Sequence, residues 1–302
     1  MNRPRVAAIV GPTAVGKSEV AVDVAERLRA EIVSVDSMQI YRGMDAGTAK
    51  PAPHLLQRVP HHLVDAMDTA NAVSVAEYQE LGRAAIHDIT LRGHLPLLVG
   101  GSGLYYRAIV DELEFPPTDQ DVRAALESEA EELGADALHA RLQSLDERAA
   151  AKIEPGNIRR TVRALEVIQL TGRPFSDNAA AWERYESRYE LRVAGLERDR
   201  TELRERVAAR VDAMLAAGLI AEARDLDSRG VLSRTARQAL GYRQILEAGP
   251  GEDDSAVRES IVRATARFAR RQESWFRADP RLRWFDASRP DLVTTLAGYL
   301  GE

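Results

Sequence analysis

The hydrophobic positions at the start of the chain change their period after a short glycine-rich stretch. Val6 to Val10 form a continuous apolar run, which predicts a buried strand. From Glu19 to Leu28 the apolar residues recur three or four positions apart, which predicts a helix. The alternation then continues, with strands expected at 31–35, 61–64 and 95–99 and a helix expected at 75–89. Such alternation predicts a parallel α/β sheet with crossover helices on both faces.

The pattern changes after Pro116 and Pro117. From Asp119 to Leu170 helical periodicity continues without a convincing strand, which predicts a helical insertion. A returning strand is expected at 189–196, followed by a long helix at 201–217 and a basic helix near the C-terminus. We therefore predict an α/β core from residues 1–114 and 190–302 and an all-helical insertion at 115–189.

The glycine-rich stretch between the first strand and the first helix carries the clearest chemistry. Its sequence, Gly-Pro-Thr-Ala-Val-Gly-Lys-Ser at 11–18, matches a P-loop in the strand, loop and helix context that the pattern requires. Gly11 and Gly16 let backbone N–H groups turn inward, and Lys17 adds positive charge for a di- or triphosphate. Ser18 has the hydroxyl that usually binds the accompanying Mg²⁺. An ordinary glycine turn is disfavoured by this context, and the core is predicted to be P-loop NTPase-like.

Two more candidates follow predicted strands. Asp36 ends a strand expected to lie beside the P-loop strand, where a parallel sheet opens onto its ligand crevice. Its carboxylate suits a proton acceptor or a water-mediated Mg²⁺ ligand, although an Asp here also caps turns. The turn Gly100 to Gly103 permits close backbone approach to a ligand, and Ser102 offers a hydroxyl. Glycine turns after strands are common, so this turn is the weaker signal.

Composition limits the class of protein. The chain has 302 residues, of which 45% are hydrophobic, so it can bury a sizeable core. It has no apolar run of about 18 residues, which predicts no membrane contact. The absence of cysteine excludes disulfides and cysteine zinc sites and fits a cytoplasmic location. The six histidines lack metal-ligand spacing, and no hydrophobic seam predicts an oligomer, so a monomer is expected.

The charge is unevenly distributed. A formal net charge of −6 argues against a globally nucleic-acid-like protein. Between Ala256 and Phe285, however, eight arginines stand against three acidic residues. Arg159 and Arg163 share one helical face by their spacing, which suits phosphate binding but also a solvated charged surface. Local basic patches therefore remain candidates for contact with RNA.

Several stretches together resemble one family closely. They are the P-loop, Asp-Ser-Met-Gln-Ile-Tyr-Arg-Gly-Met-Asp at 36–45, Gly-Thr-Ala-Lys-Pro at 47–51, Gly-Gly-Ser-Gly-Leu-Tyr from Gly100, Arg-Ala-Leu-Glu-Val from Arg163, Gln238 to Gln244, and Arg270-Arg271-Gln272 with Trp275. In this combination the chain resembles the bacterial tRNA dimethylallyltransferases, also called tRNA isopentenyltransferases. The resemblance covers nearly the whole chain.

The resemblance implies the reaction and its site. A dimethylallyl group would pass from dimethylallyl diphosphate to the exocyclic amino nitrogen of the tRNA adenosine just 3′ of the anticodon. The catalytic residues it implies are Asp36 as the proton acceptor, with Ser102 and Arg206, although Arg210 lies one turn from Arg206. The diphosphate site it implies comprises Gly11, Thr13, Ala14, Val15, Gly16, Lys17 and Ser18, with Mg²⁺ as the cofactor on Ser18.

The family likeness also implies an RNA surface that takes the anticodon stem-loop with its target base extruded. The contacts it implies are Ser37, Met38, Gln39, Arg123, Arg159, Arg160, Arg163, Gln238, Arg243 and Arg271. The chain departs from the family pattern in having Ser102 where Thr is usual, and Asn157 and Arg159 where Asp and Gln are expected. The first departure keeps the hydroxyl, and the second concerns only the detail of RNA contact.

Three other functions are compatible with parts of the chain. A P-loop small-molecule kinase would explain residues 1–110 equally well, but it leaves the helical insertion and the basic C-terminal helix unexplained. An adenine-nucleotide prenyltransferase would need no RNA. An RNA-binding module with a vestigial P-loop is the non-enzymatic alternative, and the coexistence of Lys17, Ser18 and Asp36 argues against it.

Overall fold

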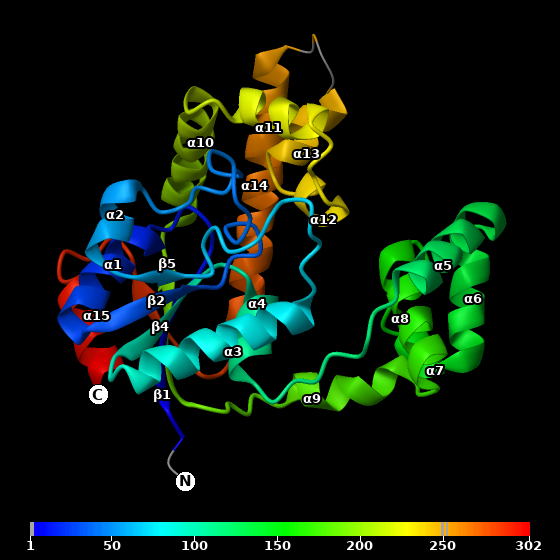
Figure 1. Cartoon of the computed structure of the whole chain (residues 1–302), viewed down its shortest axis with the longest axis horizontal. Coiled ribbons are helices and arrows are strands. Elements are labelled where there is room, and N and C mark those ends of the chain that lie inside the picture. The colour runs from blue at the N-terminus through cyan, green and yellow to red at the C-terminus, as the bar shows by residue number, and fades with distance from the viewer. Residues whose placement is uncertain (1–2, 249–250, 252) are drawn as a thin grey trace. The chain divides into compact units, whose positions relative to one another are not determined.

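A six-stranded sheet forms the centre of the computed structural model, in which residues 3–248, 251 and 253–302 are described. Its strands are β1 (Arg5–Val10), β2 (Ala30–Ser34), β3 (His61–His62), β4 (Leu95–Gly100), β5 (Glu190–Glu197) and β6 (Leu282–Asp286). They pair in the order β3-β2-β4-β1-β5-β6, and every pair is parallel (Figure 1). The predicted α/β class is confirmed.

Helices account for most of the remaining chain. Those before the helical segment are α1 (Lys17–Leu28), α2 (Pro53–Arg58), α3 (Val75–Leu91) and α4 (Gly103–Val110). The helical segment holds α5 (Gln120–Leu133), α6 (Ala135–Leu145), α7 (Glu147–Ala150), α8 (Ile158–Thr171), the 3₁₀ helix η1 (Phe175–Asn178) and α9 (Ala179–Glu183). The last part holds α10 (Arg200–Ala216), α11 (Leu219–Ser228), α12 (Arg234–Arg237), α13 (Tyr242–Ala248), α14 (Asp254–Arg277) and α15 (Leu292–Gly301).

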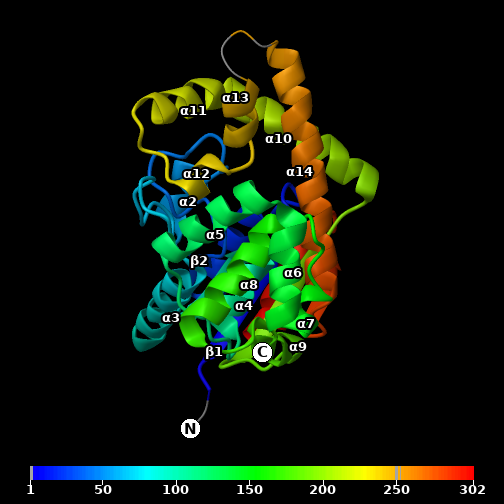
Figure 2. The ribbon, with the colours of Figure 1, turned by 90° about the vertical axis from the view of Figure 1, so that its right-hand side faces the viewer.

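Each face of the sheet has its own hydrophobic core because side chains alternate along a strand. Along β1, Ala7 and Ile9 face a cluster with α1, α2 and α15, whereas Val6, Ala8 and Val10 face a cluster with α3, α4, α11, α13 and α14. Figure 2 shows α14 as the long helix that runs from the sheet towards α11 and α13. The sheet is buried on both sides, as its near-continuous apolar strands predict.

Two strand expectations need correction, and one strand was missed. Asp36 follows β2, which is not beside the P-loop strand, because the crossover through α1 leaves a position that β4 occupies. The strand expected at 61–64 ends at His62, since Leu63 takes a φ of 61° that leaves the extended region. β6 was not predicted, because its alternation lies in a stretch dominated by arginines.

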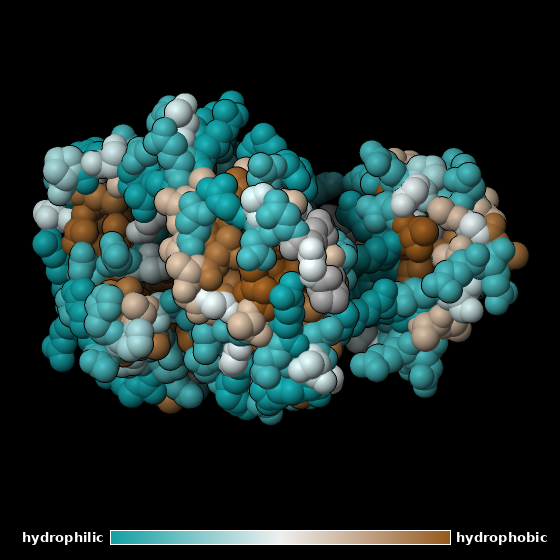
Figure 3. Space-filling view, turned by 90° about the horizontal axis from the view of Figure 1, so that it is seen from above, coloured by the Kyte–Doolittle hydropathy of each residue, from teal (hydrophilic) through white to brown (hydrophobic). Residues whose placement is uncertain are grey.

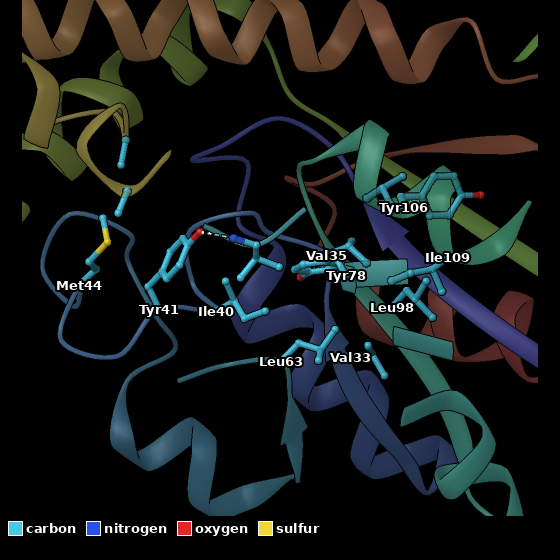
Figure 4. Close-up of a cluster of buried hydrophobic side chains, with 14 of the residues drawn as sticks. Val33, Val35, Ile40, Tyr41, Met44, Leu63, Tyr78, Leu98, Tyr106 and Ile109 are labelled. Carbon is cyan, nitrogen blue, oxygen red and sulfur yellow. Dashed lines mark hydrogen bonds between the residues drawn. The ribbon is translucent and has the colours of Figure 1, made fainter. Parts of the chain in front are cut away.

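The loop after Asp36 is anchored by its own apolar residues. Ile40, Tyr41 and Met44 are each at most 1% exposed and lie in the cluster that Figure 4 shows. The Tyr41 hydroxyl accepts a hydrogen bond from the backbone N–H of Val73, at 3.3 Å. The loop is therefore a packed part of the fold, and it holds the residues just before it in a defined position.

The chain divides into two compact units, residues 1–111 with 187–302 and residues 112–186. We call them the core unit and the helical unit; the expected boundaries were 114 and 190. Leu126, Leu142 and Val162 are at most 2% exposed and form the helical unit's own core with their neighbours from α5 to α8. In Figure 3 each unit shows hydrophobic patches framed by hydrophilic side chains. Among the described residues no helix combines the length and apolarity needed to cross a membrane.

Candidate functional site

The P-loop begins where β1 ends, and the structure shows why glycine is required at two of its positions. Gly11 has a φ of 148°, and a Cβ there would lie 2.6 Å from the carbonyl oxygen of Leu196 on β5. Gly16 caps α1 with a φ of 108°, and Ala14 also takes a positive φ of 65°. These conformations turn the backbone into a concave loop at the N-terminus of α1, where the helix dipole favours an anion.

Lys17 lies inside this loop. Its Nζ donates to the carbonyl oxygens of Gly11, at 2.9 Å, and Pro12, at 2.7 Å. Burial and, to a smaller extent, the nearby positive charge of Arg210 lower the pKa of Lys17 to about 7, although Asp36 acts to raise it. Among the described residues no carboxylate forms an ion pair with the Lys17 ammonium, so an incoming anion would find its charge uncompensated.

Asp36 uses one carboxylate oxygen to cap a turn and presents the other. Its Oδ1 accepts hydrogen bonds from the backbone N–H groups of Met38, at 2.9 Å, and Gln39, at 3.4 Å, so it does cap the following turn. Among the described residues Oδ2 accepts none. The hydroxyl of Tyr78 donates to the backbone oxygens of Ser34, at 2.7 Å, and Asp36, at 3.2 Å, which fixes the main chain here. One carboxylate oxygen is thus rigidly presented and available.

The glycines in the turn after β4 are explained by packing against α14, whereas the sequence suggested close approach to a ligand. A Cβ on Gly101 would lie 2.2 Å from Nε2 of Gln272, and one on Gly103 would lie 2.0 Å from Cε3 of Trp275. These glycines make room for α14 rather than for a ligand. Ser102 is the N-cap residue just before α4 and donates its backbone N–H to the carbonyl oxygen of Val35, at 3.1 Å, which places it next to Asp36.

Arg206 lies at the P-loop, as the resemblance implied. Its Nε donates to the carbonyl oxygen of Ala14, at 2.8 Å, and its Nη2 would be 3.7 Å from a Cβ on Gly16. Arg198 supports the same loop through a 3.4 Å hydrogen bond to Val15. Arg210, one turn after Arg206, lies near Lys17 and Asp36, and its pKa is lowered by burial although Asp36 acts to raise it. Arg198 was missed and Arg210 was passed over; only the spacing of the arginines on α10 pointed to the latter.

The three residues after Asp36 have unequal exposure and partners. Ser37 and Met38 are half-buried, and Met38 packs against the core cluster. The side-chain amide of Gln39 donates to the carbonyl oxygens of Thr48, at 3.3 Å, and Ala49, at 3.2 Å, and its Oε1 accepts from Ser34 at 3.0 Å. Gln39 therefore ties this loop to Ser34 and to the backbone at 48–49.

The remaining core-unit candidates lie on the surface of its last helices. Gln238 and Arg271 are exposed, and Arg271 lies over the ring of Phe268 at 5.7 Å. Arg243 is half-buried, with its Nε 3.6 Å from the Glu247 carboxylate. Of the three, Gln238 and Arg271 have the greater access to a large partner.

The helical unit separates its candidate arginines into two pairs. Arg123 and Arg163 donate to the carboxylate of Glu166, which is 0% exposed, each with a contact of 2.8 Å. Arg163 also donates to the backbone of Pro116 at 2.8 Å. Arg159 and Arg160 lie on the exposed first turn of α8, and within the described part of the unit neither side chain has a hydrogen bond or ion pair. These two arginines are available to bind a phosphate backbone.

The donor set suits a metal ion that a substrate brings with it. No group of three or more His, Cys, Asp or Glu side chains in the described chain could hold a metal ion by itself. Ser18 is exposed on the first turn of α1, and Asp36 supplies a carboxylate. Mg²⁺ commonly takes one or two protein oxygens and completes its shell with phosphates and waters, so these residues fit it.

Comparison with known proteins shows which family the chain belongs to. A family model described as IPP transferase matches residues 39–279. The chain belongs to this family. A tRNA dimethylallyltransferase of Streptomyces avermitilis is 53% identical over 292 residues, which cover 96% of this chain and 93% of that protein. Another, from Kineococcus radiotolerans, is 54% identical over 297 residues, covering 95% and 93%.

Two solved structures of similar proteins share the fold. The tRNA isopentenylpyrophosphate transferase of Bacillus halodurans matches with a TM-score of 0.72 and 40% identity, over 99% of this chain and 97% of that one. A eukaryotic dimethylallyltransferase captured acting on tRNA matches with a TM-score of 0.81 at 24% identity, over 98% of this chain and 77% of that one. The latter likeness concerns the fold alone.

Proposed function

We propose that this protein transfers a dimethylallyl group from dimethylallyl diphosphate to the exocyclic amino nitrogen of the tRNA adenosine just 3′ of the anticodon. The observation that carries the proposal is the pairing, in a member of the IPP transferase family, of a P-loop with a rigid carboxylate beside it. In the reaction, the bond between the allylic carbon and the diphosphate oxygen breaks, a carbon–nitrogen bond forms, and the amino group loses a proton.

The P-loop holds the leaving group in this proposal. Lys17, the loop amides and the N-terminus of α1 stabilise the negative charge that develops as diphosphate departs. Arg206 adds a guanidinium that is already oriented by its hydrogen bond to Ala14. An allylic carbon tolerates positive character, so stabilising the departing diphosphate compensates for the weak nucleophilicity of an adenine amino group.

Asp36 receives the proton in this proposal. Its Oδ1 is occupied by backbone donors, so the proton goes to Oδ2. Arg210 and Lys17 lie near this carboxylate. Ser102, next in space to Asp36, is placed to hold the diphosphate or the incoming amino group.

Mg²⁺ is the proposed cofactor, with Ser18 as its protein ligand. When bound with the diphosphate it would neutralise part of the charge of the leaving group. The anticodon stem-loop is the proposed RNA partner, and the target base must leave its stack to reach the P-loop. The exposed residues Arg159, Arg160, Gln238 and Arg271 contact the RNA in this proposal.

The test is direct transfer of label. Purified protein is incubated with Mg²⁺, isotope-labelled dimethylallyl diphosphate and unmodified tRNA, and the digested nucleosides are analysed by mass spectrometry. We expect labelled adenosine at the position 3′ of the anticodon. Label on free adenine nucleotide alone would establish the nucleotide prenyltransferase, and consumption of ATP without labelled tRNA would establish the kinase.

The variant for this test is Asp36→Asn. Asparagine keeps an oxygen for the backbone donors of Met38 and Gln39 but is a far weaker proton acceptor, so the turn remains while the chemistry is lost. We expect kcat to fall by roughly 10²- to 10⁴-fold. Asp199→Asn is the matched control, because Asp199 also accepts two backbone hydrogen bonds, at the start of α10, and Asn caps helices equally well.

A further inference from the structure

Gln272 connects two loops that the sequence places far apart. It lies on α14 and is 7% exposed. Its Oε1 accepts the backbone N–H of Thr13 in the P-loop, at 2.9 Å, and its Nε2 donates to the carbonyl oxygen of Gly101, at 2.9 Å. A single side-chain amide thus joins the P-loop to the turn that carries Ser102, and both of its polar atoms are used.

The packing leaves Gln272 little freedom. A Cβ on Gly101 would lie only 2.2 Å from Nε2, so the turn reaches the amide because residue 101 has no side chain. Exchanging the amide oxygen and nitrogen would set N–H against N–H at Thr13 and oxygen against oxygen at Gly101. A side chain here must therefore accept on one side and donate on the other, at the length of glutamine.

Lys17 and Gln272 hold the same short segment from two sides. In the free protein Lys17 donates to Gly11 and Pro12, and Gln272 accepts from the next residue, Thr13. When Lys17 turns its charge to a bound diphosphate, it withdraws at least part of its support from these carbonyls. The hydrogen bond from Thr13 to Gln272 then keeps the segment in shape.

We propose that Gln272 is a positioning residue that holds the P-loop in its diphosphate-binding shape by joining Thr13 to Gly101. The role rests on the proposed function of the P-loop as a diphosphate site. It also removes one donor from that site, because the N–H of Thr13 points to Gln272 and leaves Thr13 only its hydroxyl for a ligand. The basic helix α14 is thereby linked directly to the leaving-group site.

The first test removes both hydrogen bonds at nearly constant volume. For Gln272→Met we expect the dissociation constant for pyrophosphate in the presence of Mg²⁺ to rise about tenfold, as for the loss of a buried hydrogen bond. We also expect the KM for dimethylallyl diphosphate to rise, while affinity for tRNA changes by less than about twofold, because the buried side chain of Gln272 offers no surface to RNA. Calorimetric titration with pyrophosphate measures the first quantity without requiring turnover.

Gln272→Glu separates positioning from general loosening. The ionised carboxylate still accepts from Thr13 but cannot donate to Gly101, so pyrophosphate affinity falls at neutral pH. Protonation restores the donor, and the affinity of this variant relative to wild type is expected to recover as the pH is lowered. A merely structural role would give no such recovery, and its absence would overturn the proposal.

Gln79→Met is the matched control. Gln79 is 9% exposed on α3 and donates to the carbonyl oxygen of Ala108, at 2.7 Å, away from the P-loop. We expect this variant to lose thermal stability but to keep its affinity for pyrophosphate. Equal loss of pyrophosphate affinity in Gln79→Met and Gln272→Met would contradict a specific role for Gln272.

Amide exchange in the wild type covers the case in which a Gln272 variant does not fold. The amide of Thr13 should exchange slowly without ligand, because Gln272 binds it, and exchange at the rate of an open loop would overturn the proposal. Failure of the wild type to bind pyrophosphate would instead refute the proposed function of the P-loop. The two failures are therefore distinguishable.

Discussion

The two compact units place their positive charges differently. In the core unit, Lys17 and Arg206 donate to carbonyl oxygens of the P-loop. In the helical unit, Arg159 and Arg160 project from α8 without partners among the described residues. A positive charge that the P-loop already orients suits one small anion. An exposed arginine without a partner suits a large polyanion, whose phosphates supply the opposite charge. Position in the fold, more than net charge, separates the two kinds of binding.

The sharpest way to break this comparison is Lys17→Met. If Lys17 stabilises the departing diphosphate, kcat/KM for dimethylallyl diphosphate falls by about 10³-fold in this variant, as when other electrostatic stabilisers are removed, while tRNA affinity stays constant. Steady-state kinetics and a tRNA binding titration measure the two quantities. Lys152→Met is the control, since Lys152 is exposed in the helical unit. Unchanged turnover in Lys17→Met would revive the RNA-binding module with a vestigial P-loop.

Within the helical unit, Glu166→Gln tests whether Arg123 and Arg163 are structural. The change leaves two arginines facing a buried neutral group, so we expect the unit to lose about 2 kcal/mol of stability, less than for a fully buried pair because both arginines are partly exposed. Hydrogen exchange across α8 in the full-length chain measures the loss locally.

Glu129→Gln is the matched control for that variant. Glu129 pairs with Arg141 in the same unit, and both side chains are partly exposed. Surface pairs contribute about 0.2–1 kcal/mol, so exchange across the unit should scarcely change. Equal effects of the two substitutions would remove the distinction between structural and RNA-binding arginines.

A smaller effect is expected from replacing the outward pair together. The double variant Arg159→Ala/Arg160→Ala should weaken tRNA binding about tenfold and reduce the slope of log affinity against log salt by about 2, roughly 1 for each lost phosphate contact. Pyrophosphate affinity should not change. Arg141→Ala supplies an arginine control from the same unit, and a salt slope reduced equally in that variant would argue against specific contacts at the start of α8.

The smallest expected effect is the uptake of a fraction of a proton by Lys17 when pyrophosphate binds. Burial and Arg210 lower the pKa of Lys17 to about 7, against the opposing effect of Asp36. We expect a bound diphosphate to raise this pKa again. Well below pH 7 the ammonium is already formed, whereas at pH 8 pyrophosphate binding should take up roughly 0.9 proton at Lys17. Affinity should therefore decline as the pH rises above 7.

Calorimetry in buffers of different ionisation heat measures this uptake. Lys17→Arg is the control, because a guanidinium stays charged throughout the range and leaves only the titration of pyrophosphate itself. Equal proton uptake by wild type and Lys17→Arg at pH 8 would show that Lys17 is already charged in the free protein, so that burial does not govern its state.

Local patterns in the sequence were enough to predict much of the fold. Apolar or β-branched runs predicted β1, β2 and β4 within a residue or two, because strands buried on both faces need apolar residues at successive positions. The strand expected at 189–196 matches β5 equally well, although polar residues interrupt its apolar positions. The P-loop was predictable for a related reason: its backbone conformation requires glycine at 11 and 16. The position of Asp36 just after a strand was predictable, whereas the neighbour of that strand in the sheet was not.

Contacts between distant segments were beyond such patterns. Only the tertiary structure decided that β4 separates β1 from β2, that Arg123 and Arg163 bind Glu166 while Arg159 and Arg160 do not, and that Gln272 reaches Thr13. By sequence, Gly101 and Gly103 likewise fit a turn that faces a ligand, but in the structure α14 occupies the space beside them. Sequence periodicity reports burial and backbone conformation, which are local properties, whereas the partner of a polar side chain depends on which remote segment folding brings within 3 Å of it.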